Sequence, residues 1–177
     1  GRTRPRLAAL SSFGFSGTNA HVVIEQAPDS VRTPPPHAEH LVVLSARLPE
    51  QLREQAKLLL DRLEAAAPPE LGNVSYTLAL GRRHFACRLA CTVTDLAHLR
   101  STLAEWLQTG HSTALREGRA DTRRRAPEAS ASIARTDSSS SRAVRIAEVA
   151  GRWLEGDASL LGEWFEPNAY SRVPLPT

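Results

Sequence analysis

The sequence contains no methionine, only one lysine (Lys57) and only two cysteines among its 177 residues. Cys87 and Cys91 are four residues apart, which is neither a Cys-x-x-Cys redox motif nor a common zinc spacing. On a strand both thiols would point to the same face, so we expect buried core residues rather than a chemical site. The absence of methionine, even at position 1, indicates an internal fragment or a processed chain.

Long apolar runs are also absent. No segment approaches the length of a membrane-spanning helix and no signal peptide is recognisable, so we expect a cytoplasmic protein without a membrane span. Hydrophobic residues make up 41%, somewhat below the globular norm, and the 12 prolines indicate that part of the chain carries no core. The scarcity of lysine beside abundant alanine, arginine and leucine is typical of a GC-rich bacterial genome.

Residues 11–26 read SSFGFSGTNAHVVIEQ and form the most informative stretch. Small residues surround two aromatic side chains, and glycines at this density let a backbone approach a ligand or another strand closely. The run 22–24 that follows is typical of a short buried strand. The candidate loop residues are Phe13, Gly14, Phe15, Ser16, Gly17, Thr18 and Asn19.

This stretch resembles the C-terminal signature of the ketosynthase domain of modular polyketide synthases, S-F-G-x-[GS]-G-T-N-A-H-V-[IV]-[LIV]-E. The family is a thiolase-type condensing enzyme. The resemblance implies that Phe13 to Asn19 form a substrate-pocket loop once assembled with a ketosynthase, with Phe15 beside the acyl pocket. A buried loop aromatic with no role in binding is an equal alternative for Phe15. The last strand would belong to the ketosynthase core.

The resemblance also implies what this stretch does not carry. In the family the nucleophilic cysteine and two histidines of the condensing reaction lie upstream of the signature, so we expect no catalytic residue and no metal site here. Taken alone, the chain is expected to be inactive. No cofactor is expected beyond the phosphopantetheine on a partner carrier protein.

Periodicity predicts the next elements. Residues 41–44 indicate a buried strand, Pro49 begins an amphipathic helix, a second helix covers 70–80, residues 85–93 alternate as a strand, and a third helix covers 96–109. This order predicts an α+β fold, a small antiparallel sheet of about three strands with three or four helices packed on it. Because one face of 85–93 is wholly apolar, we expect one buried side and helices on one face.

Composition divides the chain into five parts: a ketosynthase C-terminal strand and tail (1–27), a proline-rich connector (28–40), an α+β subdomain (41–110), a disordered Arg/Ser-rich connector (111–141) and a helix with an extended tail (142–177). The motifs LVVLSAR (41–47) and NVSYTLALGRRHF (73–85) resemble the ketosynthase-to-acyltransferase linker subdomain. RWLEG (152–156) and RVPLPT (172–177) resemble the post-acyltransferase linker. No G-H-S-x-G acyltransferase motif stands between them, which resembles trans-acyltransferase synthases, with an engineered excision as the alternative.

The later helix carries more apolar surface than one small sheet needs. We expect Val144, Ala147, Ala150 and Leu154 to share its buried face, with Val149 and Trp153 nearby. One hypothesis is that this helix and the following cluster contact a partner; the other is that they complete the core of the subdomain. The candidate partner-contact residues are Trp153, Leu154, Leu160, Leu161, Trp164 and Phe165.

Other candidate sites are weaker. The run 123–125 has three arginines but no interleaved aromatics, and a net charge of +3 does not favour nucleic-acid binding. His21 lacks partners at metal-ligand spacing and is expected to be structural, and the serines of 138–141 lie in no nucleophile motif. The remaining candidates, which form no constellation, are His84, His98 and His111.

Two functions remain. The first is a non-catalytic structural and docking part of a polyketide synthase, which braces the ketosynthase. The second is the C-terminal part of an active ketosynthase whose catalytic residues lie upstream or on another chain. The implied partners are an upstream ketosynthase body, itself a homodimer, an acyl carrier protein, and a trans-acyltransferase or neighbouring synthase chains.

Overall fold

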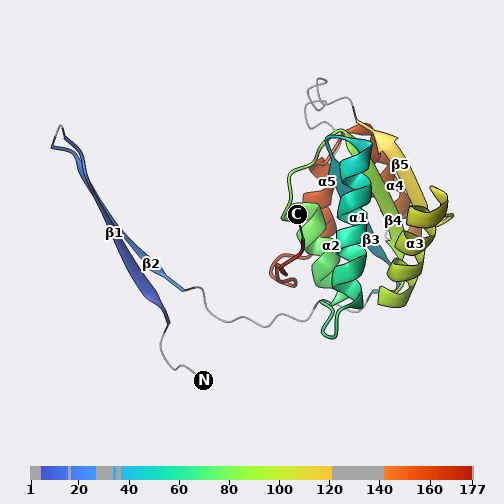
Figure 1. The fold of residues 1–177 in the computed structure, drawn as a ribbon, viewed down its shortest axis with the longest axis horizontal. Helices are drawn as coiled ribbons and strands as arrows, with labels where there is room; N and C mark the ends of the chain where they lie inside the picture. Colours follow the sequence, from blue (N-terminus) through green and yellow to red (C-terminus); the bar gives the residue numbers. More distant parts are fainter. Residues whose placement is uncertain (1–4, 16, 27–33, 35–36, 121–141, 177) are drawn as a thin grey trace. The chain divides into compact units, whose positions relative to one another are not determined.

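The computed structural model describes residues 5–15, 17–26, 34, 37–120 and 142–176. They fall into two compact units, Gly1–Val31 and Arg32–Thr177. The first unit is a β-hairpin and the second is an α+β domain, shown in blue and in cyan to red in Figure 1.

The hairpin pairs β1 (Leu7–Phe13) with β2 (Asn19–Glu25) in antiparallel register, from Leu7 opposite Glu25 to Phe13 opposite Asn19. The sequence predicted the second strand; the strand character of the residues before Ser11 is a finding of the structure. Successive side chains alternate between faces, so both faces of the hairpin carry apolar residues. Those with large exposed side chains are Leu7, Leu10, Phe13, Val22, Val23 and Ile24.

The domain is built on a three-stranded antiparallel sheet with the order β3-β4-β5. The central strand β4 (Cys87–Val93) pairs with β3 (His40–Ala46) on one side and with β5 (Leu115–Arg119) on the other. The α+β class and the small antiparallel sheet of about three strands are therefore confirmed.

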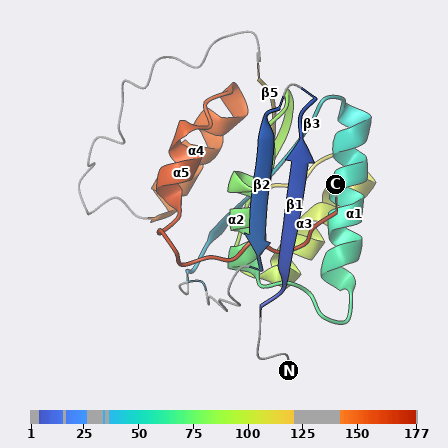
Figure 2. The same cartoon turned by 90° about the vertical axis from the view of Figure 1, so that its left-hand side faces the viewer.

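Five helices pack on this sheet within the described part of the chain: α1 (Pro49–Glu64), α2 (Leu71–Leu80), α3 (Leu96–Thr109), α4 (Arg142–Glu155) and α5 (Ser159–Trp164). In Figure 2, α1 and α3 lie on one side of the domain's sheet and α4 with α5 on the other. The core is continuous across the sheet.

Helices on both sides correct the expectation of a single buried face. Arg88 and Ala90, on the face of β4 expected to meet solvent, are as buried as Leu89 on the opposite face. The Arg88 guanidinium lies 4.9 Å from the ring centre of Trp153 on α4. The sequence pattern does not predict this burial, because an arginine in a strand is typical of a solvated face.

The start of α1 and both ends of α3 lie where local sequence signals predict them. Pro49 opens α1, where a missing N–H leaves no hydrogen bond unmade. The Asp95 carboxylate caps α3 by accepting the N–H of His98 at 2.8 Å, and Gly110 ends it with a left-handed φ of 77°.

The buried stripe of α4 differs from the predicted one. Val144 is 61% exposed and Ala147 is also exposed, whereas Ile146 is buried. The buried residues follow the spacing i, i+3, i+4, i+7, i+8, which is one helical face rotated from the predicted one. It keeps the predicted Ala150 and Leu154 but has Ile146 in place of Val144 and Ala147. The buried residues are Ile146, Val149, Ala150, Trp153 and Leu154.

Strand β5 lies in the range 111–141, which was predicted to be a connector without structure. Leu115 is buried, and Ala120 donates its N–H to the carbonyl of Ala86 at 2.8 Å, which extends the pairing. Strand β5 contains three charged residues and one glycine, a composition that is typical of a loop. Among the residues that the structure describes, every helix is too short or too polar to span a lipid bilayer.

Candidate functional site

The predicted pocket loop forms the turn of the hairpin. Phe13 ends β1, Asn19 begins β2, and Gly14 donates its N–H to the carbonyl of Thr18 at 2.7 Å. A Cβ on Gly14 would lie 2.6 Å from that same carbonyl oxygen, and Gly17 has a φ of 88°, so both positions require glycine. Phe15 is fully exposed at this turn.

Ser11 and His21 face each other across the hairpin, with Ser11 Oγ 2.7 Å from His21 Nδ1. A serine nucleophile needs a base of this kind, but also a group that orients the base and donors that stabilise an oxyanion. The described residues add neither to this exposed pair. The arrangement is that of a cross-strand structural contact, as expected for His21.

The residues predicted to contact a partner are all buried inside the domain. Trp153 has no exposed surface, and the other five are less than 10% exposed. This burial favours the alternative in which they complete the core, because a side chain without free surface offers little to a partner. The six are Trp153, Leu154, Leu160, Leu161, Trp164 and Phe165.

The C-terminal tail runs along α2 and is held by two side chains of that helix and by Arg82, which follows it. Ser171 donates its N–H to Asn73 Oδ1 at 2.8 Å, and Val173 donates its N–H to Thr77 Oγ1 at 3.0 Å. Two residues of extended chain span roughly 6.6 Å and four residues of helix roughly 6 Å, so the two spacings match. Asn73 and Thr77 thus replace a β-strand partner for the tail.

Arg82, just after α2, completes this attachment. Its guanidinium donates to the carbonyls of Leu175 at 2.6 Å and Pro176 at 3.3 Å. Sequence patterns alone indicate no individual role for Asn73, Thr77 or Arg82. The available signal was the presence of polar residues at helical spacing within an otherwise apolar helix, which is buried almost throughout.

An aromatic cluster fixes the beginning of the tail. Tyr170 stacks on Tyr76 with ring centres 5.4 Å apart and meets Phe165 edge-on at 5.1 Å. His37 Nε2 lies 3.1 Å from the Tyr170 hydroxyl. A Cβ on Gly72 would stand 2.6 Å from the Cβ of Pro34, so the connector also packs closely on α2.

Burial lowers the pKa of His37 and of His40 from their ordinary values, and the positive charge of Arg142 acts in the same direction on both. The two rings meet edge-on with centres 6.1 Å apart. Nearby Glu166 opposes the shift at His37. Both histidines are thus held toward the neutral form by the packing of the tail and of α4.

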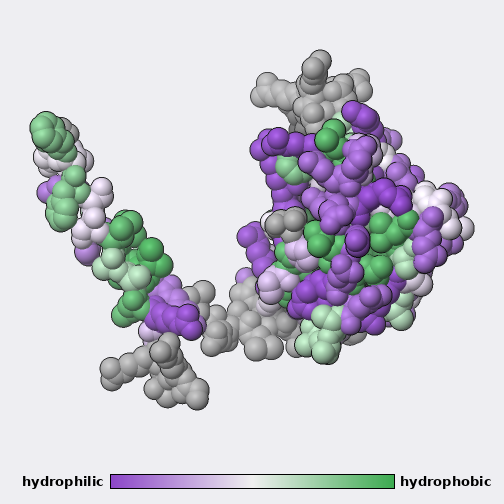
Figure 3. Space-filling model, in the orientation of Figure 1, coloured by the Kyte–Doolittle hydropathy of each residue, from purple (hydrophilic) through white to green (hydrophobic). Residues whose placement is uncertain are grey.

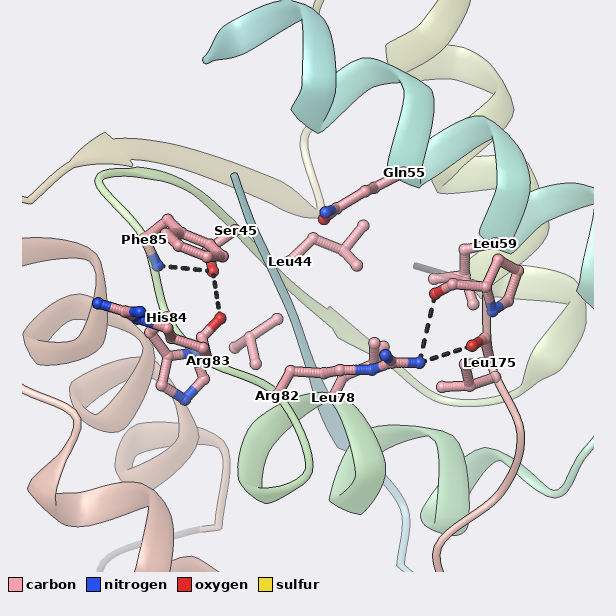
Figure 4. Close-up of a pocket in the computed structure, with 12 residues that line it drawn as sticks. Leu44, Ser45, Gln55, Leu59, Leu78, Arg82, Arg83, His84, Phe85 and Leu175 are labelled. Carbon is pink, nitrogen blue, oxygen red and sulfur yellow. Dashed lines mark hydrogen bonds between the residues drawn. The ribbon is translucent and has the colours of Figure 1, made fainter. Parts of the chain in front are cut away.

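A pocket of about 220 Å³ opens beside the loop that joins α2 to β4 (Figure 4). Its floor is aliphatic, and Gln55 on α1 points into it. The Ser45 hydroxyl accepts the N–H of Phe85 at 3.0 Å and donates to the carbonyl of Arg83 at 3.5 Å, which fixes the loop. The floor consists of Leu44, Leu59, Leu78 and Leu175.

The remaining candidates are dispersed. Cys87 and Cys91 are buried free thiols, as predicted, and burial raises the pKa of Cys91 to about 12, which keeps it protonated. Within the described ranges no group of three or more metal-ligating side chains comes together. Ser16, the arginines of 123–125 and the serines of 138–141 lie outside the described residues.

One part of the chain matches a known family model. Residues 40–103, from β3 into α3, match the family model described as CurL-like, PKS C-terminal, where PKS denotes polyketide synthase. The chain is 40% identical over 112 residues to phthioceranic/hydroxyphthioceranic acid synthase of Mycobacterium tuberculosis. It is 34% identical over 113 residues to the non-reducing polyketide synthase nscA of Aspergillus fumigatus. These matches cover 59% and 63% of the chain but only 5% and 6% of the two relatives.

Solved ketosynthase structures match nearly the whole chain. Ketosynthase twelve of the bacillaene polyketide synthase of Bacillus amyloliquefaciens is 29% identical with a TM-score of 0.69, over 100% of this chain and 29% of that one. The oxazolomycin ketosynthase domain OzmH KS7 of Streptomyces albus is 31% identical with a TM-score of 0.63, over 99% and 27%. The chain is therefore similar to the C-terminal region of polyketide synthase ketosynthases.

Proposed function

We propose that this chain is the C-terminal part of a ketosynthase region of a modular polyketide synthase, with a structural and docking role and no catalysis of its own. The hairpin completes the sheet of the ketosynthase, and the α+β domain braces the ketosynthase from outside. Strands buried on both faces are apolar on both faces. The hairpin has this composition yet exposes it, which is the observation that carries the proposal.

The trans-acyltransferase arrangement is part of the proposal. The tail 170–176 is attached to α2 directly, and the acyltransferase motifs are absent from the sequence between the two linker-like segments. A separate acyltransferase would then load the carrier proteins. The absence of an activated thiol supports a non-catalytic role, since Cys91 is held protonated and Cys87 is buried.

The test is association with a ketosynthase body that ends before the region matching β1, which begins at Leu7. We expect the chain and this body to co-purify, and the Val23→Asp substitution on the hairpin to abolish the complex. Val144→Asp is the matched control, because Val144 on α4 is 61% exposed and Val23 is 66% exposed. Equal loss of binding by both variants, or no loss by Val23→Asp, would refute the role of the hairpin.

The second candidate function, the C-terminal part of an active ketosynthase, is favoured by the full exposure of Phe15 at a glycine-fixed turn. In the same reconstituted complex, Phe15→Ala should change the preferred acyl-chain length of thioester condensation. An unchanged preference in an active complex would leave only the structural role. Condensation by the chain alone would contradict the non-catalytic proposal.

A further inference from the structure

Two arginines lie over one aromatic ring at the end of the sheet, and a third arginine, Arg82, is their neighbour in the chain. Arg47 follows β3, while Arg82 and Arg83 precede β4. The guanidinium carbons of Arg47 and Arg83 lie 5.3 Å and 5.5 Å from the ring centre of Phe85. Stacking on an aromatic ring orients a guanidinium while leaving its N–H groups free to bind.

The N–H groups of these two side chains have no partner among the residues that the structure describes. Other arginines of the domain differ, since Arg53, Arg82 and Arg100 each donate to a backbone carbonyl. Stacking on Phe85 orients the side chains of Arg47 and Arg83. Because both side chains are exposed, their N–H groups can reach a partner.

The ring of Phe85 also separates two hollows. On one side is the pocket of about 220 Å³ with its aliphatic floor, and on the other is a hollow of about 460 Å³ along α1, bordered by Arg47, Gln51 and Glu54. Glu54 is the one acidic side chain on either border within the described residues. We call the two hollows with their arginines the Phe85 groove.

Hydrogen bonds hold two walls of the groove in place. The Ser45 hydroxyl fixes the loop at Phe85, and Arg82 holds the carbonyls of Leu175 and Pro176 at the far wall of the pocket. A surface that is already in its binding geometry loses little conformational entropy on association.

We propose that the Phe85 groove is a docking surface for an acidic segment of a partner protein, with carboxylates on Arg47 and Arg83 and an aliphatic side chain in the pocket. Arginine pairs with carboxylates through two parallel hydrogen bonds, which the free N–H groups allow. The inference deepens the docking part of the proposed function and rests on it.

Charge and stacking distinguish this occupant from two others. A second copy of the chain is disfavoured because its net charge of +3 has the same sign as the groove. A single-stranded nucleic acid stacks its bases on free aromatic faces, whereas two guanidinium groups already lie over the ring of Phe85.

The test uses the full chain and a short fluorescein-labelled peptide in which Glu and Asp residues surround one Leu. Fluorescence anisotropy should show binding that weakens with added salt, and on the order of tenfold weaker binding to the double variant Arg47→Gln, Arg83→Gln. Arg116→Gln is the matched control, because Arg116 is an exposed arginine on β5, away from the groove. Thermal unfolding confirms that each variant is folded, and the two single variants repeat the comparison should the double variant not fold.

A matched peptide with Gln and Asn in place of Glu and Asp should bind on the order of tenfold more weakly. No detectable binding, equal binding of the two peptides, or equal loss in Arg116→Gln would overturn the proposal. Sedimentation that shows a dimer dissociated by the Arg47→Gln, Arg83→Gln variant would overturn it in favour of a second copy. None of these results affects association through the hairpin, so failure here is distinguishable from failure of the proposed function.

Discussion

Arg88 attaches α4 to the central strand of the sheet, and its replacement should destabilise the domain strongly. Arg88 is only 5% exposed and is the second residue of β4. The Nε–H donates to the carbonyl of Phe85 at 2.8 Å and a terminal N–H donates to the carbonyl of Trp153 in the last turn of α4. A cation at a helix C-terminus also interacts favourably with the helix dipole.

Two opposed effects decide the magnitude. Burial lowers the pKa of Arg88, which shows that the charge loses hydration, and removing a poorly solvated charge is favourable. Against this, Arg88→Met leaves the Phe85 carbonyl without this donor and the Trp153 carbonyl with only the N–H of Gly156. Hydrogen bonds from charged donors contribute about 1.5–3 kcal/mol each, so we expect a net loss of about 2–4 kcal/mol in the free energy of unfolding.

Urea unfolding followed by tryptophan fluorescence measures this loss. The control is Arg152→Met, which removes an exposed pair with Glu148 at 3.3 Å on the same helix and should cost about 0.5 kcal/mol or less. The loss of unfolding free energy for Arg88→Lys should fall between those for Arg88→Met and Arg152→Met, because lysine keeps the charge but not the planar geometry. A loss below about 0.5 kcal/mol for Arg88→Met would show that desolvation cancels the hydrogen bonds and would refute the reasoning.

Two further predictions concern the connector. Gly72→Ala should reduce the free energy of unfolding by about 1–3 kcal/mol, because the added Cβ would collide with Pro34. Gly151→Ala is the control and should be neutral or stabilising, because the space around Gly151 is open. Equal shifts of the thermal unfolding midpoint in the two variants would contradict this. Folding lowers the pKa values of His37 and His40 from the ordinary histidine value of about 6.5. At a pH near or below that value, these two histidines therefore bind more protons in the unfolded chain than in the folded one. Stability should therefore be retained above that pH and lost as the pH falls below it, and His37→Gln, His40→Gln should flatten the measured dependence.

The elements that the sequence predicted correctly are those with strong local signals. Pro49 and Asp95 mark helix starts, Gly110 marks a helix end, and the alternation across 87–93 marks the central strand. Each signal arises from backbone chemistry within a few residues. The elements that were misjudged depend on tertiary packing instead.

Strand β5 and the buried stripe of α4 illustrate this dependence. Gly118 of β5 has no side chain, and a Cβ there would lie 3.0 Å from the Cβ of Leu154, so the strand is recognisable only once α4 lies on it. The stripe of α4 in turn is determined by the sheet face that Arg88 occupies. Neither element can be assigned from its own residues, because each depends on the other.

The candidate site shows the same limit. The motif at 73–85 was recognised as a linker signature, but not the reason for its polar residues, which is the attachment of a tail about 100 residues later in the chain. Asn73 and Thr77 each satisfy one backbone N–H of that tail. The helical spacing of Asn73 and Thr77 marks two polar positions on α2, but nothing in the sequence says which distant backbone groups they bind.

The two units differ in how complete they are, and this difference supports the proposed division of roles. The domain covers both faces of its sheet with its own helices and holds its tail with its own side chains. The hairpin has two strands and no core, and an isolated two-stranded hairpin is marginally stable in water. Its exposed apolar residues on both faces are the surface that the proposed association with a ketosynthase body would bury, whereas the exposed arginines of the domain, Arg47 and Arg83, are suited to the proposed reversible contacts.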